Sequence, residues 1–376
     1  MKLAFCLFKY FPYGGLQRDF LRIARACQAR GHDIHVFTMA WEGEKEPHFK
    51  VRFLAMRGWQ NHTRQAAFAA QLQQHLQQES FDLVIGFNKM PHLHLYYAAD
   101  VCYQTRIKTQ RSFLYRLLPR YKQQLAFEKA VFKRGQATEI MLISPMQQQH
   151  FERCYQTESG RFHLLPPGIT KTETSLSSVQ AIREKIRTTY QIANEDHFLL
   201  MVGSGFKTKG VDRSIKALAA LPLFLQNKCH LFIIGQGQAK PFMTLAQRLR
   251  VAKQVHFLGA RDDVNDFFNA ADLLLHPSYH ENTGTVLLEA MVAGLPVLTV
   301  ASCGYAAYVR EAQAGQVVNA PYEQAVFNIT LQKMLLSSQQ KLWRQNGLAF
   351  GQQKDVYSMT EKAVHLIEHI GLKRGV

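Results

Sequence analysis

The sequence lacks the features of a membrane-spanning or disulfide-stabilised secreted protein. No uninterrupted apolar run among its 376 residues approaches the roughly 18 residues that a membrane-spanning helix requires. The first apolar run, Leu3–Phe8, is too short for a secretory signal and has no cleavage site after it, so it is interpreted as a buried strand. The six cysteines are scattered without a close pair, which favours reduced cytosolic thiols over disulfides or a zinc site.

Acidic residues are also scarce. The chain has 28 Asp and Glu against 45 Lys and Arg, which gives a net charge of +17. Such an excess indicates an anionic partner, namely nucleic acid, an acidic membrane surface or a phosphorylated substrate. Because no helix-turn-helix, RNP or zinc-finger pattern is present, we expect no nucleic-acid binding. No Asp-x-Asp motif is present to hold a metal across phosphates, so metal-independent chemistry is expected.

Strands alternate with helices in two successive series, which predicts an α/β protein with two doubly wound parallel-sheet domains. The Pro-Pro-Gly at 166–168 and the polar stretch after it form the best boundary. We therefore expect domains at 1–168 and 172–355, followed by an amphipathic helix at Thr360–Ile370.

The stretch Leu273–Leu298 holds two carboxylates in otherwise apolar surroundings. Its pattern predicts a strand at Leu273–Leu275, a helix at Thr283–Ala293 and a strand at Leu295–Val300. Glu281 lies in the loop after the first strand, where open α/β sheets bind ligands. Glu289 lies within the helix, and a surface-facing residue is the simpler interpretation of it. Gly284, at the helix start, allows close backbone approach, which favours a ligand site for both acids.

A second glycine-rich loop, Gly203–Gly210, follows a predicted strand and carries Lys207 and Lys209. It is not a Walker A motif, but lysines at a helix N-terminus suit a diphosphate. Two acids of the first domain stay ambiguous. Asp19 is placed in the first turn of a helix at Leu16–Arg30, where it would complement the helix dipole. Asp100 lies among apolar neighbours, as a buried structural acid or as a site residue.

The segment 104–134 is basic and interleaved with aromatic and leucine residues at roughly helical spacing, with Pro119 expected to kink or restart the helix. It is typical of a surface that lies on anionic lipid, although a packed helix with a solvated basic face explains it about as well. The cations expected to contact the membrane are Arg106, Lys108, Arg111, Arg116, Arg120 and Lys122.

The pair Glu281-x7-Glu289, Lys209-Gly210 and the glycine loop resemble the retaining glycosyltransferases of family 4, which have the GT-B fold. More narrowly, several runs are similar to the lipopolysaccharide core glucosyltransferases, type I, of Gram-negative bacteria. These runs are Lys9–Phe20, Gly86–Pro91, Ala98–Tyr103, Lys209–Ser214 and Cys303–Ala306.

The resemblance implies two Rossmann-like domains that face a central cleft. The domain at 1–168 would bind the acceptor, and the domain at 172–355 would bind a nucleotide sugar. A C-terminal helix at about 356–376 would pack back on the first domain. The implied reaction moves an α-hexose, glucose from UDP-glucose, onto an inner-core heptose with retention and without a cofactor. The alternatives are UDP-GlcNAc, UDP-galactose or UDP-GalNAc as donor, or another glycolipid acceptor. The implied location of the protein is the cytoplasmic face of the inner membrane, where it would bind peripherally to anionic lipid.

The resemblance also implies residue roles. Glu289 would hold the ribose, Glu281 the sugar hydroxyls and Lys209 the diphosphate, with Arg261 beside the uracil. The amides of Gly284, Thr285 and Val286 would contact the phosphate or the sugar, and Gly15 would approach from the first domain. Asp19 becomes an acceptor-side acid or base, with Asp100 on the same side. Two expected basic positions differ from the family pattern, so Lys207 and Lys171 are the expected substitutes.

Overall fold

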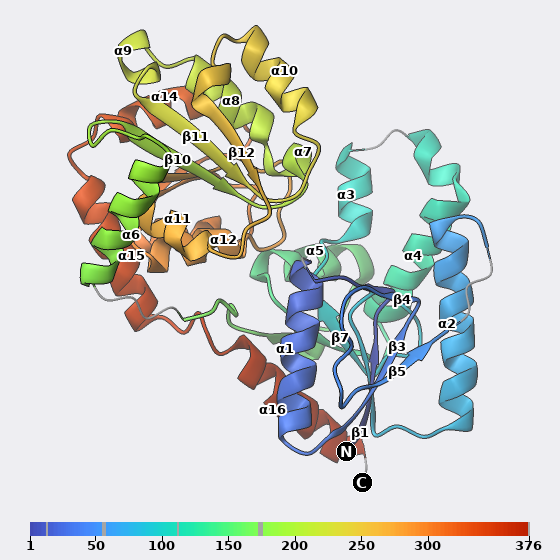
Figure 1. Ribbon diagram of the computed structural model, residues 1–376. Coiled ribbons are helices and arrows are strands. Elements are labelled where there is room, and N and C mark those ends of the chain that lie inside the picture. Colours follow the sequence, from blue (N-terminus) through green and yellow to red (C-terminus); the bar gives the residue numbers. More distant parts are fainter. Residues whose placement is uncertain (13, 55–57, 111–112, 172–175, 375–376) are drawn as a thin grey trace. The chain divides into compact units, whose positions relative to one another are not determined.

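The structure is a computed structural model that describes residues 1–12, 14–54, 58–110, 113–171 and 176–374. Contacts divide the chain into two compact units, one formed by Met1–Gly168 with Tyr357–Val376 and the other by Ile169–Val356 (Figure 1). Within the described ranges no helix has both the length and the apolar character needed to cross a bilayer.

The first unit contains a seven-stranded parallel sheet in the order β5-β3-β1-β6-β7-β8-β9. Its strands are β1 Lys2–Cys6, β3 Asp33–Thr38, β5 Lys50–Phe53, β6 Leu83–Gly86, β7 Leu95–Ala98, β8 Glu139–Leu142 and β9 Phe162–Leu164. A separate pair, β2 Lys9–Tyr10 and β4 Ala40–Trp41, extends beyond it. The chain builds outward from β1 through β3 to β5 and then resumes on the other side of β1 with β6. The order therefore reverses between β1 and β6.

Helices cover both faces of this sheet because successive side chains of β1 point to opposite faces. Leu3 and Phe5 pack into one apolar cluster, and Ala4 and Cys6 pack into the other. The first cluster is covered by α1 Gly15–Ala29 and α16 Met359–Arg374. The second is covered by α2 Asn61–Gln78, α4 Pro119–Phe132 and α5 Pro145–Tyr155. Between β7 and α4 lie α3 Tyr103–Gln110 and the 3-10 helix η1 Phe113–Leu117, and η2 Ser159–Arg161 precedes β9.

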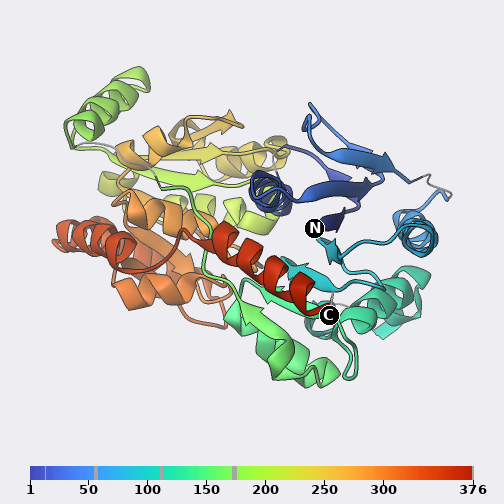
Figure 2. The same ribbon diagram turned by 90° about the horizontal axis from the view of Figure 1, so that it is seen from below.

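The helix α16 belongs to the core of the first unit although it follows the second unit in the chain. Five of its side chains lie in the same cluster as Phe20, Ile23 and Cys27 of α1, namely Met359, Ala363, Val364, Ile367 and Ile370. At its outer edge Arg30 Nη1 lies 2.8 Å from Glu368 Oε2. Figures 1 and 2 show the red α16 beside the blue α1 from two directions.

The second unit contains a six-stranded parallel sheet in the order β12-β11-β10-β13-β14-β15. Its strands are β10 His197–Val202, β11 Cys229–Ile234, β12 Val255–Gly259, β13 Leu273–His276, β14 Val297–Val300 and β15 Gly315–Val318. Leu199 and Met201 of β10 face the cluster under α8 Val211–Ala219, α9 Leu223–Gln226, α10 Lys240–Arg248 and α14 Gln324–Leu335. Here the order reverses between β10 and β13.

The opposite face of the second sheet packs on α11 Val264–Ala270, α12 Thr285–Val292 and α13 Ala306–Ala312 (Figure 1). In turn, α6 Leu176–Thr189 packs on α11, and α15 Gln340–Gln353 packs on α12. Phe198 of β10, for example, meets Phe267 of α11 edge to face at 6.3 Å between ring centroids. The 3-10 helix η3 Ala252–Gln254 precedes β12, and the short α7 Phe206–Lys209 precedes α8. The prediction of two parallel α/β units is thereby confirmed.

Two predicted element boundaries in the central stretch are wrong by two residues. The helix expected from Thr283 begins at Thr285, because Gly284 has φ +81° and so cannot belong to a right-handed helix. The strand expected from Leu295 begins at Val297.

Candidate functional site

Lys209 and Glu281 meet at the reversal point of the second sheet. Lys209 follows β10 and Glu281 follows β13, and these strands are neighbours although 72 residues separate the two side chains. Lys209 Nζ donates to Glu281 Oε2 in a close ion pair. Both side chains are largely buried, with 20% and 17% exposed. The carboxyl end of a parallel sheet at its reversal point is where open α/β sheets bind ligands.

A buried histidine lies beneath this pair. His276, the last residue of β13, is fully buried, and its Nε2 lies 3.4 Å from Glu281 Oε2. Neither ring nitrogen has a well-aligned hydrogen-bond partner in the described part of the chain. Burial lowers the pKa of His276, and the neighbouring Glu281 carboxylate opposes that shift. Burial would raise the pKa of Glu281, but His276 and Lys209 outweigh it and hold that pKa at about 2. Glu281 is therefore an acceptor of hydrogen bonds throughout the neutral range.

Glycines allow this close approach. A Cβ on Gly210 would lie 2.1 Å from the carbonyl oxygen of Pro277, so only glycine lets the end of α7 pack against the loop after β13. A Cβ on Gly284 would lie 2.4 Å from Cys303 Sγ. The loop after β14 also fixes the Glu281 loop, because Gly304 N donates to the Glu281 carbonyl oxygen at 3.1 Å.

The N-terminus of α12 lies directly after this loop. No side chain caps it, so the first-turn N–H groups of Thr285 and Val286 form a positively polarised end. Glu289 lies one turn after Thr285 on the same helix face, and both are half-buried. The neighbouring residues of α12 are buried, namely Val286, Leu287, Leu288, Ala290 and Met291.

The other predicted donor-side residues do not join the Lys209–Glu281 pair. Lys207 is exposed on α7, so the expectation that both lysines lie in a loop is wrong. Arg261 follows the edge strand β12 and is held by Asp263, with Nε–Oδ1 at 2.6 Å and Nη2–Oδ2 at 2.7 Å. Lys171 is exposed.

In the first unit Asp19 is hydrogen-bonded to a side chain of the sheet. Tyr97 of β7 donates its hydroxyl to Asp19 Oδ2 at 2.8 Å, and burial raises the pKa of Asp19. The helix α1 begins at Gly15 and has no acid in its first turn, so the helix-dipole interpretation of Asp19 is wrong. Asp100 is exposed after β7, so it is not a buried structural acid. Gly15 is exposed at the start of α1.

The described residues of the basic segment form most of α3 together with η1 and α4, and the structure resolves the alternative at Pro119. This proline occupies the first turn of α4, so the helix restarts there. Leu114, Leu117 and Leu118 are 71%, 60% and 46% exposed. Of the predicted membrane-contact cations, Arg116 is half-buried and Arg111 lies outside the described residues. The exposed members are Arg106, Lys108, Arg120 and Lys122.

Sequence reasoning missed His276, Cys303 and the buried Glu128 that supports α3. For His276 a signal was present, since a histidine that ends an apolar strand beside a loop acid is unusual. The described residues contain no group of three or more side chains that could hold a metal ion.

Comparison with known proteins agrees with this geometry. Residues 13–173 match the family described as Glycosyltransferase Family 4, and residues 182–348 match Glycosyl transferases group 1. The chain is 45% identical over 368 residues to the lipopolysaccharide glucosyltransferase WaaG of Escherichia coli K12, covering 98% of each chain. A crystal structure of WaaG superposes with a TM-score of 0.92 over 97% of this chain and 99% of the other.

A more distant solved structure shares the fold alone. Anabaena HepE in complex with UDP-glucose is 19% identical, with a TM-score of 0.72 over 98% of this chain and 100% of the other. Both matches extend over both units, but the match to WaaG also has 45% sequence identity. The chain therefore belongs to the GT-B glycosyltransferases, in the family of the lipopolysaccharide glucosyltransferase WaaG.

Proposed function

We propose that this glycosyltransferase moves glucose from UDP-glucose onto an inner-core heptose of lipopolysaccharide with retention of the α configuration. The observation that carries the proposal is the 45% identity to WaaG over 98% of both chains. The alternative is the same reaction with another UDP-sugar or another glycolipid acceptor.

The donor would bind at the reversal point of the second sheet. Lys209 and the N-terminal amides of α12, at Gly284, Thr285 and Val286, are the positive groups that suit a diphosphate. Glu281 would accept hydrogen bonds from the sugar hydroxyls, and its low pKa keeps it ionised for that role. In the absence of donor the two charges neutralise each other, so neither is buried alone.

Glu289 and Arg261 are the next proposed donor contacts. Glu289 shares a helix face with Thr285 and would hold the ribose hydroxyls. Arg261, fixed by Asp263 at the same edge of the sheet, would lie beside the uracil. Lys171, Lys207 and Gly15 are the further proposed contacts of the diphosphate.

Asp19 is the proposed acceptor-side acid or base. Burial raises the pKa of the Asp19 carboxyl, so this group holds a proton more readily than an exposed aspartate does. Tyr97 fixes its orientation. Asp100, exposed after the strand that carries Tyr97, would contact hydroxyls of the acceptor.

Retention would follow from attack on the face that the leaving group vacates. The acceptor oxygen forms its bond to the anomeric carbon as the bond from that carbon to the β-phosphate oxygen breaks. The acceptor proton passes to the departing phosphate oxygen. The positive charge of Lys209 would stabilise the negative charge that develops on that phosphate.

One transfer assay tests the identity of the donor and of the acceptor. The acceptor in this assay is core oligosaccharide from a strain that lacks this enzyme. We expect one hexose to be added from UDP-glucose, at least tenfold faster than from UDP-GlcNAc or UDP-galactose. Mass spectrometry and the anomeric proton coupling measure the product. Faster transfer from another UDP-sugar, or a β product, would replace this proposal by the alternative.

A second proposal concerns the surface formed by Leu114, Leu117, Leu118 and the exposed cations around them. We propose that it docks on anionic lipid at the cytoplasmic face of the inner membrane, because exposed leucines and adjacent cations combine apolar and electrostatic attraction. The buried side of the segment explains why it keeps this shape. Glu128 accepts hydrogen bonds from Tyr103 N at 2.8 Å and Gln104 N at 3.0 Å, which caps α3.

Vesicle flotation tests this docking surface. Binding should require anionic lipid and weaken as salt rises from 0.05 to 0.5 M. Replacement of Arg106, Lys108, Arg120 and Lys122 by glutamine should lower binding at least tenfold, since each cation contributes about 1 kcal/mol near such a surface. The matched control replaces four exposed cations of the second unit, Arg248, Lys253, Lys333 and Lys341. Equal binding to neutral vesicles, or an equal loss in the control, contradicts the proposal.

A further inference from the structure

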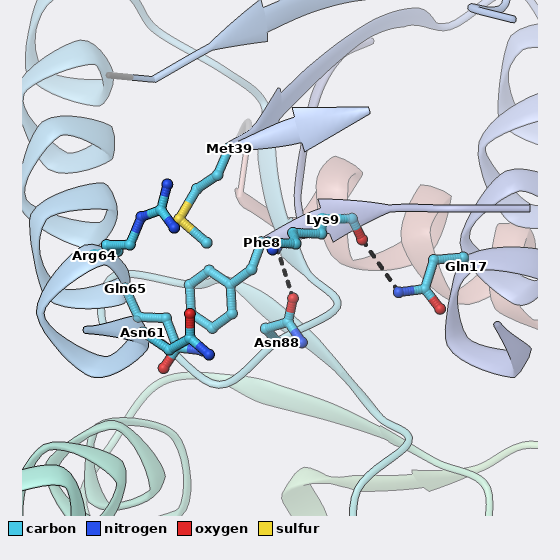
Figure 3. A pocket seen from close by; sticks show the side chains of 8 residues that line it. All are labelled: Phe8, Lys9, Gln17, Met39, Asn61, Arg64, Gln65 and Asn88. Atoms are coloured by element: carbon cyan, nitrogen blue, oxygen red, sulfur yellow. Dashed lines mark hydrogen bonds between the residues drawn. The ribbon is translucent and has the colours of Figure 1, made fainter. Parts of the chain in front are cut away.

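A cavity of about 280 Å³ lies in the first unit at the reversal point of its own sheet. Phe8 follows β1, Met39 follows β3 and Asn88 follows β6, so the cavity opens beyond the carboxyl ends of three adjacent strands. Its side wall is the first turn of α2, which contributes Asn61 and Arg64 (Figure 3). The Lys209–Glu281 pair occupies the corresponding position in the second sheet. The first unit therefore carries a ligand-sized hollow where parallel sheets bind ligands.

Arg64 gives this cavity its charge. Its guanidinium extends from α2 toward the sulfur of Met39 (Figure 3). Its Nε is buried and has no hydrogen-bond partner among the described residues. A buried donor without a partner is rare in folded proteins and calls for an explanation. No carboxylate appears among the described residues that line the cavity. Lys9 also lines the cavity, and its carbonyl oxygen accepts from Gln17.

The amides of the cavity are arranged to donate. Asn88 Oδ1 accepts from Phe8 N at 2.7 Å, which leaves the NH2 group as the remaining donor of Asn88 (Figure 3). Gln65 Oε1 likewise accepts from Gln124 Nε2 at 2.6 Å, so its NH2 group is the end left for a ligand. Gln17 Nε2 donates to Lys9 O at 3.1 Å and leaves one acceptor oxygen. Several amide groups and the guanidinium of Arg64 match a polyol that carries an anionic group.

The cavity also has an apolar wall. The half-buried ring of Phe8 is held edge to face by Phe68, with 5.6 Å between ring centroids. Met39 lies beside it and is 9% exposed. A fixed aromatic face next to a few hydrogen-bonding groups is typical of sites for small ligands. The volume suits one sugar ring and excludes a whole nucleotide sugar.

We propose that this cavity is an acceptor subsite that binds one acidic sugar residue, whose carboxylate or phosphate pairs with Arg64. The inference rests on the proposed function, because it takes the acceptor to be a glycan. The subsite would contribute to binding of the acceptor. Substitutions in it should therefore change the affinity for the acceptor and leave the affinity for the donor unchanged.

The probe is deacylated core oligosaccharide that ends before the first hexose, titrated calorimetrically into the full-length protein. Arg64→Gln should weaken its binding at least tenfold, and Arg64→Lys should recover part of the loss. Asn88→Asp keeps the acceptor for Phe8 N but adds a negative charge, so it should weaken binding by a similar factor. Arg248→Gln, which removes an exposed cation of the second unit, is the matched control and should bind as the wild type does. UDP-glucose affinity should be unchanged in all four variants.

Two treated forms of the oligosaccharide identify the anion. In one the phosphates are removed, and in the other the carboxyl groups are reduced. The wild type should bind one of the treated forms at least tenfold more weakly than the untreated oligosaccharide. Arg64→Gln should bind that same treated form and the untreated oligosaccharide with equal affinity. Wild-type affinity in Arg64→Gln, or an equal loss of affinity in both proteins with each treated form, would overturn the subsite.

Turnover separates this inference from the proposed function. If the wild type binds the oligosaccharide through Arg64 but transfers no hexose to it, the proposed function fails and the subsite stands. If transfer occurs and Arg64→Gln has a wild-type KM for the acceptor, the proposed function stands and the subsite fails.

Discussion

Lys209→Ala is expected to lower kcat by about 100-fold to 1,000-fold, the usual effect of removing one group that stabilises developing charge. Lys209 is the cation that lies between the glycine loop after β10 and Glu281, so its loss removes positive charge where the diphosphate would leave. It also removes one of the two groups that lower the pKa of Glu281 to about 2. That pKa should rise, so the activity of the variant should begin to fall at a higher pH than that of the wild type as the solution is acidified. Initial rates with saturating UDP-glucose from pH 4 to pH 8 measure both effects.

Two further variants test whether the positive charge of Lys209 is responsible for this loss of activity. Lys209→Arg keeps the charge and should retain more activity than the alanine variant. Lys216→Ala removes an exposed lysine of α8 whose contact is Asp212 at 3.3 Å, and it should leave the rate unchanged. Near-full activity in Lys209→Ala would exclude Lys209 from the departure of the diphosphate. A loss confined to KM would assign it to ground-state binding instead.

Glu128→Gln should give the largest loss of stability in the first unit. Glu128 is fully buried, and its Oε1 lies 2.5 Å from Lys89 Nζ, which belongs to a side chain only 10% exposed. It also accepts from the Tyr155 hydroxyl and from the amides of Tyr103 and Gln104. Removing one partner of a buried pair leaves the other charge uncompensated, which costs about 3–5 kcal/mol. For a unit of this size the transition temperature should fall by about 6–20 °C in calorimetric unfolding.

The control is Glu311→Gln, which breaks an exposed ion pair with Lys354. Exposed pairs contribute about 0–1 kcal/mol, so its transition should stay within about 2–4 °C of the wild type. Because Glu128 caps α3, the variant should also bind anionic vesicles more weakly than the control. A transition as high as that of Glu311→Gln would show that Lys89 and the α3 amides find other partners.

Composition and periodicity were sufficient to predict the fold class, because strand and helix patterns are local and alternate regularly in both units. They also located the loop after β13, since an acid next to a glycine at a strand end is visible in the sequence. The contact between Lys209 and Glu281 was not visible, because it depends on which strands become neighbours. The helical state of α7 was missed because a four-residue helix between glycines has no periodic pattern.

Burial was the property that the sequence determined least. Asp100 lies among apolar residues in the sequence but is exposed, because the chain turns at the surface after β7. Glu128 lies among basic residues in the sequence but is buried, because the last two turns of α4 pack against the sheet. His276 ends an apolar strand next to a loop acid, but its complete burial depends on segments that lie elsewhere in the chain. Each case was decided by tertiary contacts that a single sequence does not encode locally.

The position of α16 has a consequence for biosynthesis. The core of the first unit contains five side chains of α16, yet the ribosome makes that helix only after all of Ile169–Val356. The second unit is continuous in sequence and can complete its core as soon as α15 has emerged. Until α16 has been synthesised, the first unit exposes the apolar side chains of α1 that this helix covers. The order of folding should therefore reverse the order of synthesis, and the unfinished first unit is the species that a chaperone would have to shield.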